Sequence, residues 1–233
     1  GTEPVRGVYN ESYLDEIEAI VTMAGTYNIY TILDAHQDGL SEYFCGEGLP
    51  SWAVKRSTYH RFDPLSKPYP MPYDEFDDDC FYTEDKHQGA VFPTRQACDD
   101  HSHGLGWGES TFESAQAYQG LWDNWNGTGD AFAAMWAHVA ERFQGRPEVV
   151  GLNLVNEPFA GDFYHDPLIM VPWPNPKNGD AVNLQPTYDK INAAVRLVDE
   201  DVLLFIEGIT WGDAGSGFTT APGGQAYTNR AVI

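Results

Sequence analysis

Apolar positions along the chain fall into two alternating patterns. Continuous runs of a few apolar residues, bounded by loop residues, are typical of strands buried in a parallel sheet. Such runs occupy residues 29–33, 149–155 and 202–206, and a further one begins at 230–233. Apolar residues at intervals of three and four predict helices at 12–24, near 111–122, at 131–143 and at 188–198. This alternation predicts an α/β fold with a parallel sheet.

One segment does not fit the alternation. Residues 49–108 are rich in Pro, Asp and Tyr and are too long for an ordinary connection between a strand and a helix. Long connections of this kind usually carry function. We therefore expect a loop insertion that covers a site.

Polar side chains follow each apolar run directly. They are His36 and Asp38 after the first run, Asn156 and Glu157 after the second, and Glu207 and Trp211 after the third. Parallel strands bring their carboxyl ends to one edge, where (β/α)8 barrels carry their active sites. No glycine-rich phosphate-binding pattern follows any of the runs, so a nucleotide-binding sheet is disfavoured.

The pair Asn156 and Glu157 suits glycoside hydrolysis. A glutamic acid can protonate a leaving oxygen, and an asparagine amide can hold a sugar hydroxyl. Alternatively, Asn156 caps a helix whose first turn holds Glu157 and Pro158. His36 and Asp38 either bind sugar hydroxyls or stabilise the loop at the strand end, and Trp211 either stacks on a sugar ring or fills the barrel rim.

Charge and hydropathy exclude several classes of partner. The chain has 13 Lys and Arg against 35 Asp and Glu, a formal charge of −22, which disfavours nucleic acid and anionic lipid. No segment approaches the roughly 20 apolar residues of a membrane-spanning helix, and the first residues do not resemble a signal peptide. We therefore expect no nucleic-acid partner and no transmembrane segment.

The cysteines lack metal-site spacing, so no metal is expected. Because Cys80 and Cys98 both lie in the insertion, we favour a Cys80–Cys98 disulfide over free thiols. Asn10 and Asn126 each begin an N-glycosylation triplet. Together these features favour a secreted or lysosomal protein.

With these residues in view, the chain resembles glycoside hydrolase family 5, and within it the endoglycoceramidase-related enzymes. The matching stretches are LDAHQD (33–38), YFCGEGLPSWAV (43–54), LNLVNEP (152–158), FIEGITW (205–211) and FTTAPGGQAYTN (218–229). The most specific is HQD joined to FCGEG. A departure is Ala35, where a larger apolar residue is usual.

The resemblance implies a retaining β-glycosidase that cleaves sugars from ceramide, with no cofactor. It implies that Glu157 is the general acid/base and that Asn156 binds the 2-hydroxyl of the reacting sugar. It also implies that His36 and Asp38 form hydrogen bonds with other sugar hydroxyls. Trp211 remains a candidate for stacking on a sugar ring. Glu207 becomes a structural residue, and the nucleophile lies on a strand absent from this chain.

The same resemblance identifies residues 1–233 as a single incomplete catalytic domain. The expected fold is a partial (β/α)8 TIM barrel containing about strands 3 to 5 and the start of strand 6, which we expect to be inactive alone. Two other functions stay open. One is a family 5 polysaccharide hydrolase of the cellulase or mannanase type, and the other is a non-catalytic carbohydrate-binding relative.

Overall fold

The computed structural model describes residues 1–56, 81–84, 90–101, 109, 111–172, 174–209 and 216–233. Its central feature is a parallel sheet in the order β1, β4, β5, β6. The strands are β1 (Thr31–Asp34), β4 (Val149–Asn153), β5 (Leu203–Phe205) and β6 (Ala231–Val232). Each predicted apolar run therefore contains a strand, and the parallel sheet is confirmed.

The predicted helices are present with small shifts at their ends. They are α1 (Glu11–Thr26), α3 (Phe112–Trp122), α4 (Thr128–Phe143) and α5 (Gln185–Val195), the last preceded by the π-helical turn η8 (Asp180–Leu184). Short 3-10 turns are η1 (Glu42–Phe44), η2 (Ser51–Ala53), η6 (Trp125–Gly127), η7 (Pro167–Met170) and η9 (Gln225–Tyr227). Within the described part of the chain, no helix is both long enough and apolar enough to cross a bilayer.

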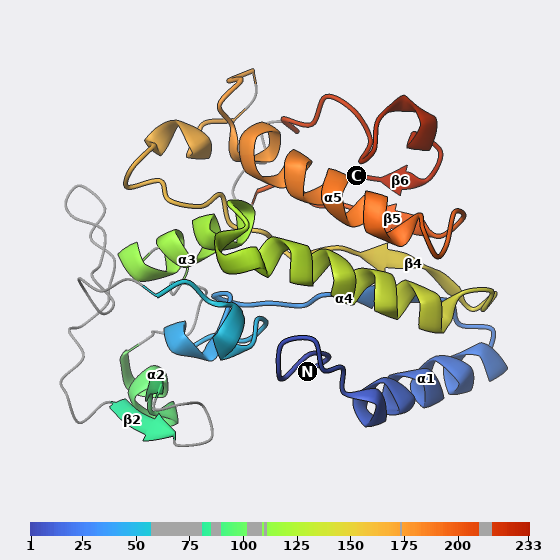
Figure 1. Cartoon of the computed structure of the whole chain (residues 1–233), viewed down its shortest axis with the longest axis horizontal. Coiled ribbons are helices and arrows are strands. Elements are labelled where there is room, and N and C mark those ends of the chain that lie inside the picture. Colours follow the sequence, from blue (N-terminus) through green and yellow to red (C-terminus); the bar gives the residue numbers. More distant parts are fainter. Residues whose placement is uncertain (57–80, 85–89, 102–108, 110, 173, 210–215) are drawn as a thin grey trace.

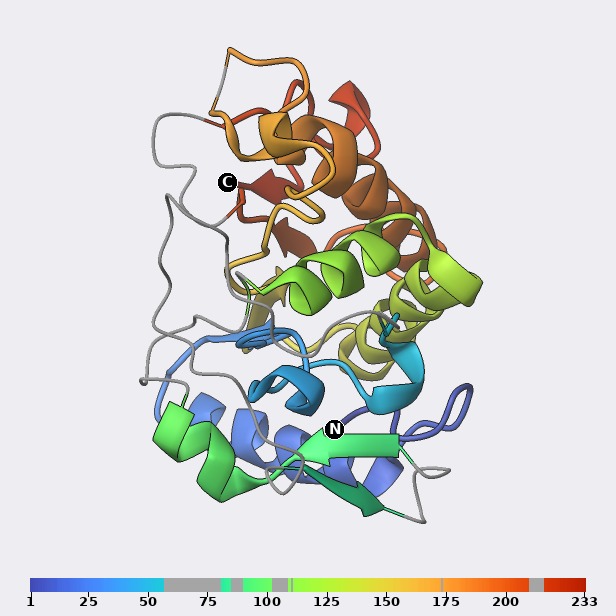
Figure 2. The same cartoon turned by 90° about the vertical axis from the view of Figure 1, so that its left-hand side faces the viewer.

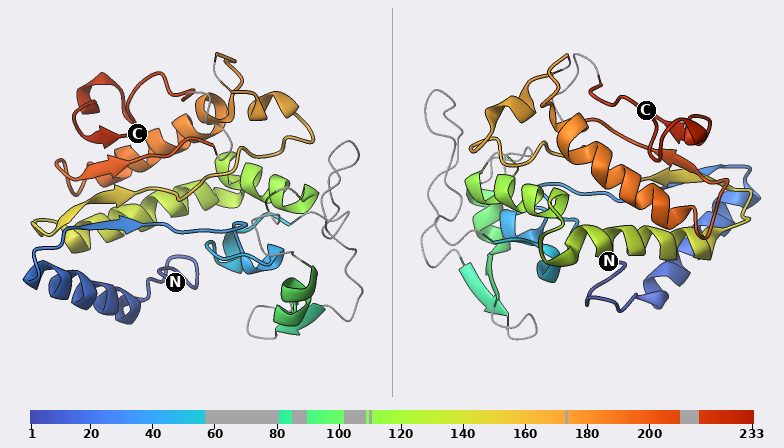
Figure 3. Two further views of the ribbon diagram at one scale, coloured as in Figure 1. Left: turned by 180° about the vertical axis from the view of Figure 1, so that it is seen from behind. Right: turned by 45° about the horizontal axis from the view of Figure 1, so that its top comes forward.

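Helices α4 and α5 lie side by side across one face of the sheet (Figure 1). From behind, the strands lie in front of these helices (Figure 3, left). The predicted apolar stripe of α4 is buried in this layer, through Phe132, Trp136, Val139 and Phe143. Burial of such large side chains against Leu152 and Leu204 of the sheet supplies the main stabilisation of the layered structure.

The insertion contains secondary structure of its own. Its described part includes an antiparallel hairpin, β2 (Phe81–Glu84) with β3 (Ala90–Pro93), followed by helix α2 (Arg95–His101). Strand β3 packs near η1, the turn that Cys45 follows.

The disulfide joins Cys45 to Cys98, with the two Cα atoms 5.3 Å apart. The predicted Cys80–Cys98 pairing is therefore wrong; Cys80 itself lies outside the described residues. That Cys80 and Cys98 lie in the same insertion did not show which cysteines are close in space. The observed bond ties the insertion to the loop that follows β1.

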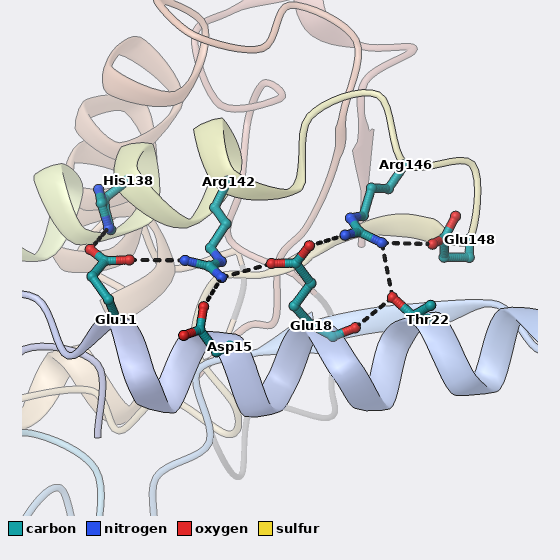
Figure 4. A network of polar contacts seen from close by, with 8 residues as sticks. All are labelled: Glu11, Asp15, Glu18, Thr22, His138, Arg142, Arg146 and Glu148. Carbon is teal, nitrogen blue, oxygen red and sulfur yellow. Dashed lines mark hydrogen bonds and ion pairs between the residues drawn. The ribbon is translucent and has the colours of Figure 1, made fainter.

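Helix α1 is attached to α4 largely by charge (Figure 4). Arg142 of α4 contacts Glu11 at 2.9 Å, Glu18 at 2.7 Å and Asp15. Beyond the end of α4, Arg146 contacts Glu18 and lies 3.1 Å from Glu148. On α1 only Leu14 and Val21 are fully buried, so this ion-pair ladder supplements a small apolar contact.

Candidate active site

The residues that follow the strands gather at one end of the sheet, which Figure 2 views directly. Parallel register places Asp34 opposite Asn153, and Asn153 opposite Phe205. The Asn153 amide donates to Asp34 Oδ1 at 2.9 Å and to Glu207 Oε1 at 2.6 Å. One side chain therefore links the ends of β1, β4 and β5.

Glu157 has an unusual backbone conformation, with φ of +41°. A left-handed residue other than glycine costs about 1–2 kcal/mol and persists only where its surroundings fix it. Its N–H donates to Glu207 Oε2 at 3.0 Å, and its carbonyl accepts from Gln37 Nε2 at 3.0 Å. The backbone of Glu157 is thus held from both neighbouring strand ends, and no helix begins here, which removes the helix-cap alternative.

Gln37 organises the interior of the site and was missed by the sequence reasoning. It is buried, donates to the carbonyls of Asn156 (2.8 Å) and Glu157, and accepts from Tyr118 Oη (2.5 Å) and from the Leu40 N–H (2.9 Å). The available signal was alternation: if His36 and Asp38 face one side of an extended segment, the residue between them faces the other.

His36 lies between two carboxylates. Its Nδ1 is 3.0 Å from Asp34 Oδ2, and its Nε2 is 3.5 Å from Asp38 Oδ2. The hydrogen bond with Asp34 is the main cause that raises the pKa of His36, and the negative charges of Asp38 and Asp34 add to it. Since His36 and Asp38 are more than half exposed, they can offer a donor and an acceptor to hydroxyls of a ligand.

The motif FCGEG has a geometric basis. Asp38 and Glu47 exchange two backbone hydrogen bonds, of 3.1 and 2.7 Å. A Cβ at Gly46 would lie 1.7 Å from the Asp38 carbonyl oxygen, so only glycine permits this close pairing. The HQD and FCGEG segments therefore fold together as one unit.

Two tryptophans, one from α3 and one from α4, hold the backbone that follows β4. The indole N–H of Trp136 donates to the Leu154 carbonyl at 3.0 Å, and that of Trp122 donates to the Phe159 carbonyl at 3.1 Å. Both indoles are buried. The sequence pattern did not reveal this role, yet they fix the backbone on either side of Asn156 and Glu157.

Sequence reasoning also missed a buried carboxyl group, which lies behind the exposed carboxyl groups of Asp38 and Glu157. Glu109 is buried, and its Oε1 accepts from the Gly39 N–H at 3.4 Å. Burial raises its pKa to about 7; the hydrogen bond from Gly39 acts in the opposite direction, and the charges of Asp38 and Glu157 raise the pKa further. Glu109, Asp38 and Glu157 are therefore close enough to act on one another. Nothing in its sequence context distinguished Glu109 from the many other acidic residues.

Other predicted features have different outcomes. The Glu157 side chain is exposed, at the end of an open four-stranded sheet in the part of the chain that the structure describes. Trp211 lies outside the described residues. His36, Asp38 and Glu47 have ligand atoms within 4.8 Å of one another, but all three are exposed and we assign no metal to them.

Comparisons with known proteins agree with this geometry. The family model described as Cellulase (glycosyl hydrolase family 5) matches residues 2–233. The chain belongs to glycosyl hydrolase family 5. Among curated proteins, this family 5 chain is 40% identical to an endoglycoceramidase of Cyanea nozakii and 39% identical to one of Hydra vulgaris, each over 100% of the chain. It spans 42% and 41% of the lengths of those relatives.

Solved structures show the same fold. The family 5 chain matches endo-glycoceramidase II from Rhodococcus sp. with a TM-score of 0.65 at 23% identity, covering 99% of this chain and 44% of that one. It matches an endogalactoceramidase with a TM-score of 0.61 at 21% identity, covering 89% and 38%. The predicted partial (β/α)8 barrel and the resemblance to the endoglycoceramidase-related subgroup are thus confirmed.

Proposed function

We propose that this chain is part of the catalytic domain of a retaining β-glycosidase that releases the glycan of glycosphingolipids from ceramide. The observation that carries the proposal is Glu157, held at the end of β4 in a strained conformation by Glu207 and Gln37, next to Asn156. Support for the substrate comes from the curated endoglycoceramidases and from a solved relative in complex with ganglioside GM3.

In the proposed reaction, Glu157 donates its proton to the glycosidic oxygen as the bond to the anomeric carbon breaks. A second carboxylate, outside this chain, bonds to the anomeric carbon. Glu157 then takes a proton from the water that hydrolyses this intermediate. Asn156 holds the sugar 2-hydroxyl, His36 and Asp38 bind further hydroxyls, and Trp211 is the candidate for stacking on the ring.

Glu207 is the other carboxylate at this edge, but its contacts favour a supporting role. One oxygen accepts from Asn153 and the other from the Glu157 N–H. A nucleophile needs an oxygen that can reach the anomeric carbon. We therefore assign Glu207 to positioning Glu157.

The test uses the complete protein with Glu157→Gln. We expect almost no turnover of natural glycolipid, whose leaving group needs protonation, but a retained first step on activated aryl glycosides, whose leaving group does not. Glu141→Gln on the exposed side of α4 is the matched control and should leave both activities unchanged. Equal losses on both substrates in Glu157→Gln would contradict the assignment.

Product analysis separates the alternatives. Ceramide released from a glycosphingolipid supports the proposal, whereas release of sugars from cellulose or mannan favours a polysaccharide hydrolase. Binding of glycans without hydrolysis of any of these substrates favours a non-catalytic relative.

We further propose a secreted or lysosomal location. The Cys45–Cys98 disulfide supports an oxidising compartment, and Asn126 is exposed in the turn between α3 and α4, where a glycan would have space. Secretory expression should yield a protein whose mass falls on treatment with peptide N-glycosidase, with a smaller fall in Asn126→Gln. An unchanged mass for the wild type would contradict the glycoprotein proposal.

A further inference from the structure

The segment that follows β5 carries Glu207, but the neighbouring strands do not hold its backbone. The sheet pairs with this segment as far as Ile206, whose N–H donates to the Val232 carbonyl at 2.9 Å. Among the described residues, no backbone hydrogen bond from a strand reaches Glu207 itself. The position of its carboxylate, which accepts from the Glu157 N–H, therefore depends on contacts with side chains.

A buried tyrosine of α5 holds the backbone of Glu207. Tyr188 has no exposed surface, and its Oη donates to the Glu207 carbonyl at 2.9 Å. Burial is the main cause that raises the pKa of Tyr188 well above its ordinary value, so the hydroxyl keeps the proton that it donates. The ring also packs against Phe218, with ring centroids 5.8 Å apart. The direction of the hydroxyl is thus fixed by the packing of the ring.

A buried carboxylate holds the same segment two residues further on. Asp180, the first residue of η8, is only 2% exposed. Its Oδ1 accepts from the Ile209 N–H and its Oδ2 from the Gly217 N–H, each at 2.7 Å. Hydrogen bonds to a carboxylate are stronger than those between neutral groups. A Cβ at Gly208 would lie 3.2 Å from both carboxylate oxygens, so the chain passes close over Asp180.

We propose that Tyr188 and Asp180 are positioning residues of the active site, which act through Glu207 to hold the general acid in place. The inference rests on the proposed glycosidase function. Glu207 Oε2 accepts from the Glu157 N–H at 3.0 Å, so a shift of the Glu207 backbone disturbs this contact. The left-handed conformation of Glu157, with φ of +41°, persists only where its surroundings fix it. Loss of either buried contact should therefore displace the Glu157 carboxyl.

Sugar binding should change much less than proton transfer. His36 and Asp38 lie on the segment after β1, which Glu47 holds through two backbone hydrogen bonds with Asp38. Neither Tyr188 nor Asp180 takes part in those contacts. The inference therefore predicts an effect on kcat rather than on KM.

Tyr188→Phe in the complete protein tests the inference, because it removes the hydroxyl and keeps the ring. For natural glycolipid, whose leaving group needs a proton, kcat should fall about tenfold, the effect of one buried hydrogen bond. KM should change by less than about twofold. The first step on activated aryl glycosides should also change by less than about twofold, because their leaving group departs without a proton.

Thr187→Val is the matched control. Thr187 is a buried residue of the same helix, and its hydroxyl donates to the Asn183 carbonyl at 2.9 Å, one turn earlier, rather than to the segment after β5. Both variants remove one buried hydroxyl and keep the shape of the side chain. Thr187→Val should keep the wild-type rates on both substrates. Equal losses in the two variants, or equal losses on the two substrates in Tyr188→Phe, would overturn the inference.

Asp180→Asn extends the test to the second contact. The amide keeps an oxygen for one backbone N–H but presents its own N–H groups to the other. We expect a fall in kcat for natural glycolipid at least as large as in Tyr188→Phe, again with a smaller effect on aryl glycosides. Wild-type rates in a folded Asp180→Asn protein would contradict the role of Asp180.

A readout without substrate separates this inference from the proposed function. In NMR hydrogen exchange, the Glu157 amide should exchange about tenfold faster in Tyr188→Phe than in the wild type, and at the wild-type rate in Thr187→Val. Unchanged exchange in Tyr188→Phe would overturn the inference. A wild type that hydrolyses neither glycolipid nor aryl glycoside would overturn the proposed function, while faster exchange in Tyr188→Phe would still support the positioning of Glu157.

Discussion

The side-chain amide of Gln37 donates a hydrogen bond to the backbone carbonyl of Glu157 across 3.0 Å, which joins the segment after β1 to the segment after β4. Gln37 is buried, and its oxygen accepts from Tyr118 and from Leu40. A side chain that faces the interior therefore determines where the backbone of the proposed general acid lies.

Replacement of Gln37 by Leu should destabilise the fold and displace Glu157. The Tyr118 hydroxyl and the Leu40 N–H would lose their buried acceptor, so we expect a loss of about 3 kcal/mol in the free energy of unfolding. Urea denaturation measures this loss, and kinetics should show a larger change in kcat than in KM because Glu157 moves. Gln144→Leu is the control: Gln144 also donates to a backbone carbonyl, that of Val198, but is exposed, and its change should stay within about 0.5 kcal/mol.

Asp34 should determine the charge state of His36. Because its hydrogen bond is the main cause that raises the pKa of His36 above 6.5, Asp34→Asn should lower that pKa more than Asp38→Asn, which removes only a charge. NMR titration of the His36 ring compares the two variants. The raised pKa stabilises the folded state below pH 6.5, and this contribution is lost as the pH rises through the raised value. A larger effect of Asp38→Asn would contradict this account.

The ion-pair ladder should contribute to the attachment of α1. Glu18→Gln weakens contacts with both Arg142 and Arg146, and we expect a loss of about 1 kcal/mol that shrinks as salt is added. Glu16→Gln, on the exposed side of the same helix, should have no measurable effect. Denaturant unfolding at low and high salt distinguishes them; equal effects of the two variants would show that helix propensity, not the ladder, is responsible.

The disulfide should be found between Cys45 and Cys98. Non-reducing peptide mapping should recover this linked pair from the wild type and from Cys80→Ser. Cys98→Ser should abolish it and lower stability by about 4 kcal/mol, as expected for a closed loop with a sequence separation of 53. Recovery of a disulfide-linked Cys80–Cys98 peptide pair would contradict this prediction and support the pairing favoured by the sequence.

The positions of the strands and helices were predictable because they depend on local apolar periodicity. Runs such as 149–155 are continuous and end at polar residues, so both the strand and its exit toward Asn156 and Glu157 could be read from the sequence. The motif HQD joined to FCGEG likewise indicated a family, and its glycine is explained by the close approach of Gly46 to Asp38.

Contacts between distant segments were not predictable in this way. Gln37 was passed over between two more conspicuous residues, and Glu109 was one of 35 acidic residues, with nothing local to show that it would be buried beside Asp38. The partner of Cys98 was misjudged for the same reason, since separation along the chain does not measure distance in space.

The sequence by itself determined the alternation of strands and helices, the edge at which the polar residues gather, and the family. Only the tertiary structure decided which groups surround Glu157, why its backbone adopts a strained conformation, and which buried carboxyl has a raised pKa. Local periodicity specifies which side of an element is apolar, whereas hydrogen bonds and pKa shifts depend on groups brought together from far apart in the chain.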